Sequence, residues 1–119
     1  MNAGNDKLTR LKTLLAESRD LNRATEVLYW DQQTQMPPLG APARAEQAAT
    51  LERLTHEMYT APEVGRLLEE LAQNAHAGDY DSDDASLVRV NWREYQRKRR
   101  IPASLVADIV RAERLAMSA

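Results

Sequence analysis

His56 and Glu57 begin the stretch of this chain that comes closest to a zinc-binding motif. In H-E-x-x-H, two histidines on one helix face hold the metal and the glutamate activates the bound water. Here the fifth position is Thr60, whose neutral hydroxyl is a poor substitute for imidazole, and the only other histidine is His76. We therefore predict no metal ligand and no catalytic residue in this segment, and interpret His56 as a helix-face side chain.

Three aspartates, Asp79, Asp81 and Asp83, imitate the start of a calcium-binding loop. Such a loop needs a glycine at its sixth position for a sharp turn and a bidentate glutamate at its twelfth. The chain has Asp84 and Val90 at these positions. We therefore interpret the acidic segment as a capping loop before a helix, because carboxylates there complement the helix dipole.

Other catalytic patterns are missing from the sequence. It has no cysteine, which excludes disulfides, thiolate metal sites and cysteine nucleophiles. It contains no G-x-S-x-G elbow, and its four glycines are isolated, so they cannot form a phosphate-binding loop.

Residues 89–100 carry six cations against one carboxylate. Four arginines recur along one helical stripe: Arg89, Arg93, Arg97 and Arg100. Nucleic-acid modules are usually strongly basic, whereas this chain has a net charge of −2, and Trp92 and Tyr95 fall on the apolar stripe instead. We therefore expect a solvated face that pairs with nearby carboxylates and binds no nucleic acid, and we keep nucleic-acid binding as a third hypothesis.

The composition predicts an all-α fold. The 119 residues include 18 Ala and 15 Leu but only six Val, two Ile and no Phe, whereas strands favour β-branched and aromatic residues. We expect one helical region over residues 1–119, with about five helices in an antiparallel, bundle-like arrangement.

Apolar periodicity and proline positions place these helices. A long amphipathic helix is predicted over about residues 6–33, ended by Met36-Pro37-Pro38. Four shorter helices follow: from Ala41-Pro42 to Tyr59, from a capping box at Thr60–Glu63 to Gly78, from the acidic loop 79–84 to about Arg99, and from Pro102 onward. The first ten residues contain no apolar signal segment, and no apolar run approaches a membrane span, so we expect a cytoplasmic protein without membrane contact.

The segment Leu28–Pro37, LYWDQQTQMP, resembles the W-D-x-x-T-x-M-P signature of the carboxypeptidase Taq family of zinc metallocarboxypeptidases. Further matching positions follow along the chain: Arg44, Gln47, Leu51, His56, Thr60, Val88, Arg89, Arg93, Ile101 and Pro102. The similarity covers almost all of this chain but only about the first quarter of a family member.

The resemblance implies an all-helical, cleft-bearing homodimer that removes C-terminal residues from peptides with a zinc-bound water. The family's H-E-x-x-H helix, its downstream glutamate ligand, and its H-P-F and H-E-S-Q motifs do not occur in this chain. The resemblance therefore transfers no catalytic residue and no metal ligand, and zinc is expected only in a full-length member.

We expect structural roles for the matching residues. Trp30 is predicted to be a buried anchor, Asp31 and Thr34 to satisfy backbone groups at the helix end, and Met36-Pro37 to fix the exit direction of the chain. The resulting hypothesis is an N-terminal helical part of a metallocarboxypeptidase that is inactive alone and associates with the remainder of the enzyme or with another copy. The alternative is a free-standing helical module that binds a protein partner without catalysis.

Overall fold

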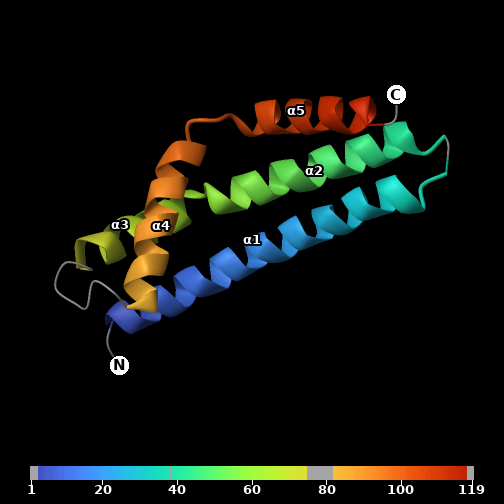
Figure 1. The fold of residues 1–119 in the computed structure, drawn as a ribbon. Coiled ribbons are helices and arrows are strands. Elements are labelled where there is room, and N and C mark those ends of the chain that lie inside the picture. Colours follow the sequence, from blue (N-terminus) through green and yellow to red (C-terminus); the bar gives the residue numbers. More distant parts are fainter. Residues whose placement is uncertain (1–2, 38, 75–81, 118–119) are drawn as a thin grey trace. The chain divides into compact units, whose positions relative to one another are not determined.

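The computed structural model describes residues 3–37, 39–74 and 82–117, and this part of the chain consists of helices without any strand (Figure 1). The helices are α1 (Ala3–Thr34), α2 (Ala41–Tyr59), α3 (Pro62–Asn74), α4 (Asp83–Lys98) and α5 (Ala103–Ala116). The all-α prediction and the long first helix are confirmed. None of the described helices is both long and apolar enough to cross a membrane.

Short turns and caps set the helix boundaries. After α1, the amides of Gln35 and Met36 both donate to the carbonyl of Asp31, and α2 then begins at Ala41, as predicted. The start of α4 differs from the prediction, because Ser82 is its N-cap and its hydroxyl accepts a hydrogen bond from the amide of Ala85 at 3.1 Å. The predicted helix end at Gly78 and the aspartates at 79 and 81 lie outside the described residues.

The chain divides into two compact units, and α1 contributes to both. The first unit combines residues up to Ala16 with Tyr59–Arg100, and therefore contains the start of α1 together with α3 and α4. The second unit combines Glu17–Met58 with the residues from Ile101 onward, and therefore contains the rest of α1 together with α2 and α5.

The first unit has an apolar core shared by its three helices. Its buried members are Leu11, Leu15, Val64, Leu67, Leu68, Leu71, Val88 and Tyr95. Trp92 packs partly buried against this core, with its ring stacked on Tyr95 at a centroid distance of 6.0 Å. The prediction that both aromatics take part in core packing is therefore confirmed.

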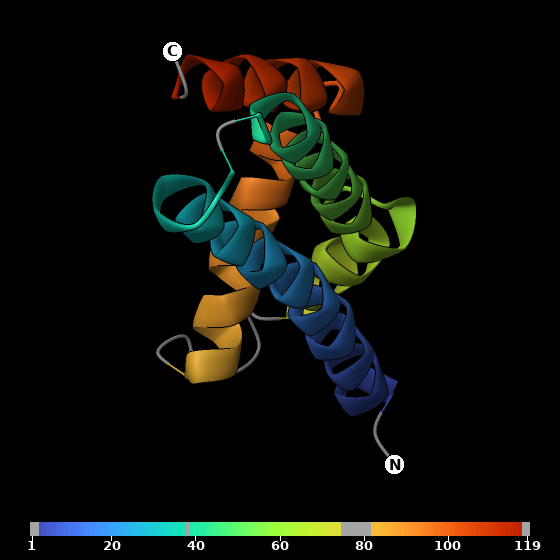
Figure 2. The ribbon, with the colours of Figure 1, turned by 90° about the vertical axis from the view of Figure 1, so that its right-hand side faces the viewer.

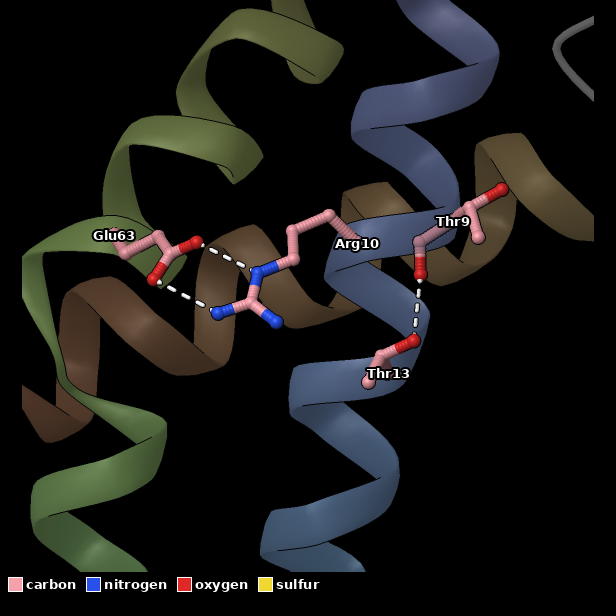
Figure 3. Close-up of polar contacts among 4 residues, drawn as sticks. All are labelled: Thr9, Arg10, Thr13 and Glu63. Atoms are coloured by element: carbon pink, nitrogen blue, oxygen red, sulfur yellow. Dashed lines mark hydrogen bonds and ion pairs between the residues drawn. The ribbon is translucent and has the colours of Figure 1, made fainter.

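Ion pairs surround this core and connect α1 to α3 and α4. Arg10 donates to the carboxylate of Glu63 at 2.8 Å, and Thr13 on the same helix donates to the carbonyl of Thr9 at 3.1 Å (Figure 3). This hydrogen bond and the charge of Arg10 lower the pKa of Glu63. Two further pairs are Lys7–Glu70 and Lys12–Asp84, at 2.9 and 2.8 Å.

The second unit packs through small side chains. Its buried residues are Ser18 and Thr25 of α1, Ala45, Ala48 and Ala49 of α2, and Ala107 of α5. Alanines allow close helix approach, and α5 lies next to α2 in both ribbon views (Figures 1 and 2). Arg111 of α5 bonds to Glu46 of α2 at 2.5 Å, which supports this placement.

Candidate functional site

Three of the motif residues predicted from sequence meet where α1 ends and α2 begins. A carboxylate oxygen of Asp31 lies 2.6 Å from Nη2 of Arg44, and Nη1 of Arg44 donates to Oε1 of Gln47, also at 2.6 Å. The pair is partly shielded, with the Asp31 and Arg44 side chains 31% and 23% exposed. Such shielding makes the attraction stronger than that of a fully solvated pair.

The end of α5 contacts the same region. Nε2 of Gln32 donates to the backbone carbonyl of Arg114 at 2.8 Å, and the Arg114 guanidinium lies 4.4 Å from the centre of the Tyr29 ring. We call Tyr29, Asp31, Gln32, Arg44, Gln47 and Arg114 together the α1-end cluster. It connects all three helices of the second unit.

Some polar atoms of the cluster are buried without a hydrogen-bond partner among the described residues. They include Oδ2 of Asp31, Nε of Arg44 and Nη1 of Arg114. The contact of Asp31 with Arg44 is therefore a close ion pair whose geometry is not that of a directed hydrogen bond. The cluster presents charge and hydrogen-bonding capacity but no nucleophile paired with a base, so its chemistry is that of a helix junction.

Trp30 does not have the predicted role of a buried anchor. Its side chain is 59% exposed. Successive helical residues are about 100° apart, so Trp30 lies far around α1 from the half-buried Leu28, two positions earlier. The apolar periodicity of α1 therefore continues through Leu28 and leaves Trp30 on the solvent side.

Asp31 and Thr34, the two polar residues of the motif, were both predicted to satisfy backbone groups at the end of α1, and only the side chain of Thr34 is seen to do so. Thr34 Oγ1 donates to the carbonyl of Trp30 at 2.8 Å, which confirms that it satisfies a backbone group near the end of α1. Asp31 was predicted to do the same, but its side chain pairs with Arg44 instead. After Pro37 the chain reverses through a hydrogen bond from the amide of Gly40 to the Pro37 carbonyl, at 2.9 Å.

The remaining motif residues lie apart from the cluster. Arg89 donates to the hydroxyl of Ser86 at 3.2 Å, and Arg93 is exposed on α4, so both belong to the first unit. Pro102 is the N-cap of α5, in an extended conformation, one position before the helix it was predicted to open.

The described residues do not fit a zinc ion. His56 Nε2 lies 2.7 Å from the carbonyl oxygen of Ile101. Because a carbonyl only accepts, this nitrogen is the donor, which leaves only Nδ1 of His56 as a possible metal ligand. Within 3–37, 39–74 and 82–117, no three His, Asp or Glu side chains gather as a metal site would need. His76 lies outside these ranges.

An open pocket of about 450 Å³ lies beside the cluster, between α1 and α2. Its lining residues are Leu28, Glu46, Gln47, Thr50 and Leu51. Gln47 belongs to both features, because its amide oxygen accepts from Arg44 while its side chain borders the pocket. The pocket is mostly apolar, which suits an apolar side chain better than a charged ligand.

Comparison with known proteins agrees with the motif. The family model described as carboxypeptidase Taq (M32) metallopeptidase matches residues 10–119. Thermostable carboxypeptidase 1 of Thermus thermophilus is 41% identical over 85 residues, which are 71% of this chain and 16% of that protein. No solved structure matches the chain significantly. The matched region is thus a small part of the length of this relative.

Proposed function

Because the chain belongs to the carboxypeptidase Taq (M32) metallopeptidase family, we propose that it is the N-terminal helical part of a zinc-dependent metallocarboxypeptidase, inactive alone. The complete enzyme would release C-terminal amino acids from peptides. The observation that carries this proposal is the match over residues 10–119 to a family whose Thermus relative extends far beyond the matched region.

In this proposal the chain supplies structure, and the zinc ligands and general base belong to residues outside the described part. The α1-end cluster supports a structural role, since its motif residues join α1 to α2. We also propose a cytoplasmic location and association with the remainder of the enzyme or with a second copy.

The direct test measures metal content and hydrolysis on the purified chain. We expect no stoichiometric zinc and no release of C-terminal amino acids from an unblocked peptide, whereas full-length Thermus carboxypeptidase assayed in parallel provides the positive control. Stoichiometric zinc together with turnover by the 119 residues would contradict the proposal.

The alternative function is a free-standing module that binds a protein partner. The open pocket between α1 and α2 favours it, because an apolar hollow on a helical surface suits a partner side chain. The two proposals predict different coding sequences after codon 119. A reading frame that continues past codon 119 into H-E-x-x-H excludes the module, whereas a natural stop at that codon favours it.

A further inference from the structure

Helix α5 is apolar on two opposite faces. The inner face, which packs within the second unit, carries Ala107, which is buried, and the half-buried Val106 and Val110. The opposite face carries Leu105 and Ile109, which are 45% and 47% exposed. Ala112 and Ala116 continue this exposed stripe. We call Leu105, Ile109, Ala112 and Ala116 the outer α5 face.

The spacing of the outer α5 face is that of a helix-packing seam. Its residues follow one another by four, three and four positions, which keeps them on one side of a helix and is the repeat through which paired helices interlock. A helix that is apolar on both sides is normally covered on both sides. An exposed apolar stripe with this spacing can pack against a second helix.

Charged residues beside the outer α5 face restrict which charges a helix packed against it can carry. Asp108 and Glu113 flank the stripe on its two sides, and both are exposed. Asp108 is bonded to Arg111 at 3.1 Å, yet its side chain remains 70% exposed. If two copies paired through this face, Asp108 would oppose Glu113 in a parallel arrangement, or each would oppose its own counterpart in an antiparallel one. Either arrangement places like charges together.

We propose that the outer α5 face docks an amphipathic helix whose apolar stripe is flanked by lysine or arginine, supplied by the peptidase polypeptide beyond the matched region. Charge complementarity favours this occupant over a second copy. The length of the Thermus relative outside its 16% match provides the polypeptide for it. The inference rests on the proposed function and specifies how the two parts of the enzyme would join.

The test uses a chimera in which residues 10–119, the range that the family model matches, replace the segment of the Thermus enzyme that aligns with the same model. The seam variant is Leu105→Glu with Ile109→Glu. The matched control is Val27→Glu with Val90→Glu, which also places two carboxylates on exposed aliphatic positions, here 64% and 54% exposed. We expect the seam variant to lower the melting temperature of the chimera by more than about 4 °C and the control by less than about 2 °C.

The same substitutions in the 119-residue chain alone provide the second measurement. There the outer α5 face has no occupant, so we expect both variants to melt within about 2 °C of the unmodified chain. Equal melting of seam and control chimeras would overturn the inference. So would sedimentation showing that the 119-residue chain dimerises and that only the seam variant abolishes the dimer, because a second copy would then be the occupant.

If the chimera does not fold, the glutamates are placed at the two aligned positions of the intact Thermus enzyme, with the same expected difference from its aligned control. Peptide hydrolysis separates the two proposals. A chimera that folds and loses stability in the seam variant, but that neither binds zinc nor hydrolyses peptides, contradicts the proposed function and leaves the seam supported. A chimera that hydrolyses peptides, but whose seam and control variants melt at the same temperature, supports the proposed function and contradicts the inference about the outer α5 face.

Discussion

Gly65 of α3 lies directly against the ring of Tyr95 of α4. A Cβ atom on residue 65 would come within clashing distance of the hydroxyl oxygen and two ring carbons of Tyr95. Tyr95 is only 7% exposed and belongs to the core of the first unit. The absence of a side chain at position 65 is therefore what allows α3 and α4 to pack this closely.

Replacing Gly65 with alanine is expected to destabilise the chain. Alanine favours a helix interior over glycine by about 1 kcal/mol, but forcing a methyl group into a packed core costs about 1–3 kcal/mol. Because the clash involves the buried ring of Tyr95, we expect the second effect to win by about 1–2 kcal/mol in urea unfolding. Arg66→Ala, at the exposed neighbouring position, is the control. If Gly65→Ala were more stable than the unmodified chain, the ring of Tyr95 would be able to move aside at little cost, and this prediction would be wrong.

The phenol of Tyr59 is expected to titrate unusually late. Burial raises its pKa from 10.0 to about 12, with a further contribution from the charge of Glu94 that exceeds the opposing effect of Arg97. The hydroxyl also donates to Oδ1 of Asn91 at 2.8 Å. Because the folded pKa exceeds the unfolded one, the stability from this phenol is complete below pH 10 and is lost as the pH rises through 12.

This late titration can be measured by the tyrosinate absorbance that Tyr59→Phe removes from the spectrum. The difference between the two proteins should develop with a midpoint near pH 12, and Glu94→Gln should shift this midpoint downward. A midpoint at the ordinary value of 10.0 would show that Tyr59 is solvated.

The ion pair of Asp31 with Arg44 is expected to show measurable coupling. A double-mutant cycle with Asp31→Ala and Arg44→Ala should give about 1–2 kcal/mol in urea unfolding, because both side chains are at least two-thirds covered. Arg23 with Glu26 is the matched control, since these side chains are 70% and 57% exposed, and its coupling should stay below about 0.5 kcal/mol. Equal coupling energies in the two cycles would show that the pair of Asp31 with Arg44 is no stronger than a solvated ion pair. That result would contradict a structural role for the α1-end cluster.

The contact of Arg10 with Glu63 predicts a stability difference that depends on pH. The hydrogen bond from Arg10, together with the charges of Arg10 and Arg66, lowers the pKa of Glu63 below 4.5. Its contribution is therefore present above pH 4.5 and lost as the pH falls through the lowered pKa. Urea midpoints of the unmodified chain and Glu63→Gln should differ at neutral pH and converge once the pH has fallen below the lowered pKa of Glu63. A difference that persists in acid would point to packing instead of charge.

Most of the fold follows from local sequence signals. Pro37 follows the end of α1, and the prolines at 42 and 62 lie in the first turns of α2 and α3. The spacing of alanine and leucine indicates which face of each helix is buried. Ser82 was missed as a cap because the aspartates on either side of it have equal capping propensity. Trp30 was assigned to the core because of its size, although its position around the helix decides its exposure.

The candidate site could be predicted only where its residues are close in sequence. Asp31, Arg44 and Gln47 lie within one helix-turn-helix segment, so the family signature already groups them. Arg114 lies 82 residues from Gln32, and no pattern in α5 distinguishes it from the neighbouring Arg111. Long-range packing of α5 determines which arginine contacts Tyr29, and that information is not local.

Neither compact unit is a continuous piece of polypeptide. The core of the first unit joins Leu11 and Leu15 to residues that the ribosome makes some fifty to eighty positions later. During synthesis the start of α1 therefore emerges with its apolar side uncovered, α3 can cover it only after Leu71 is made, and the core is complete only when Tyr95 has left the exit tunnel. Nascent chains arrested before that point should be the species that chaperones recognise.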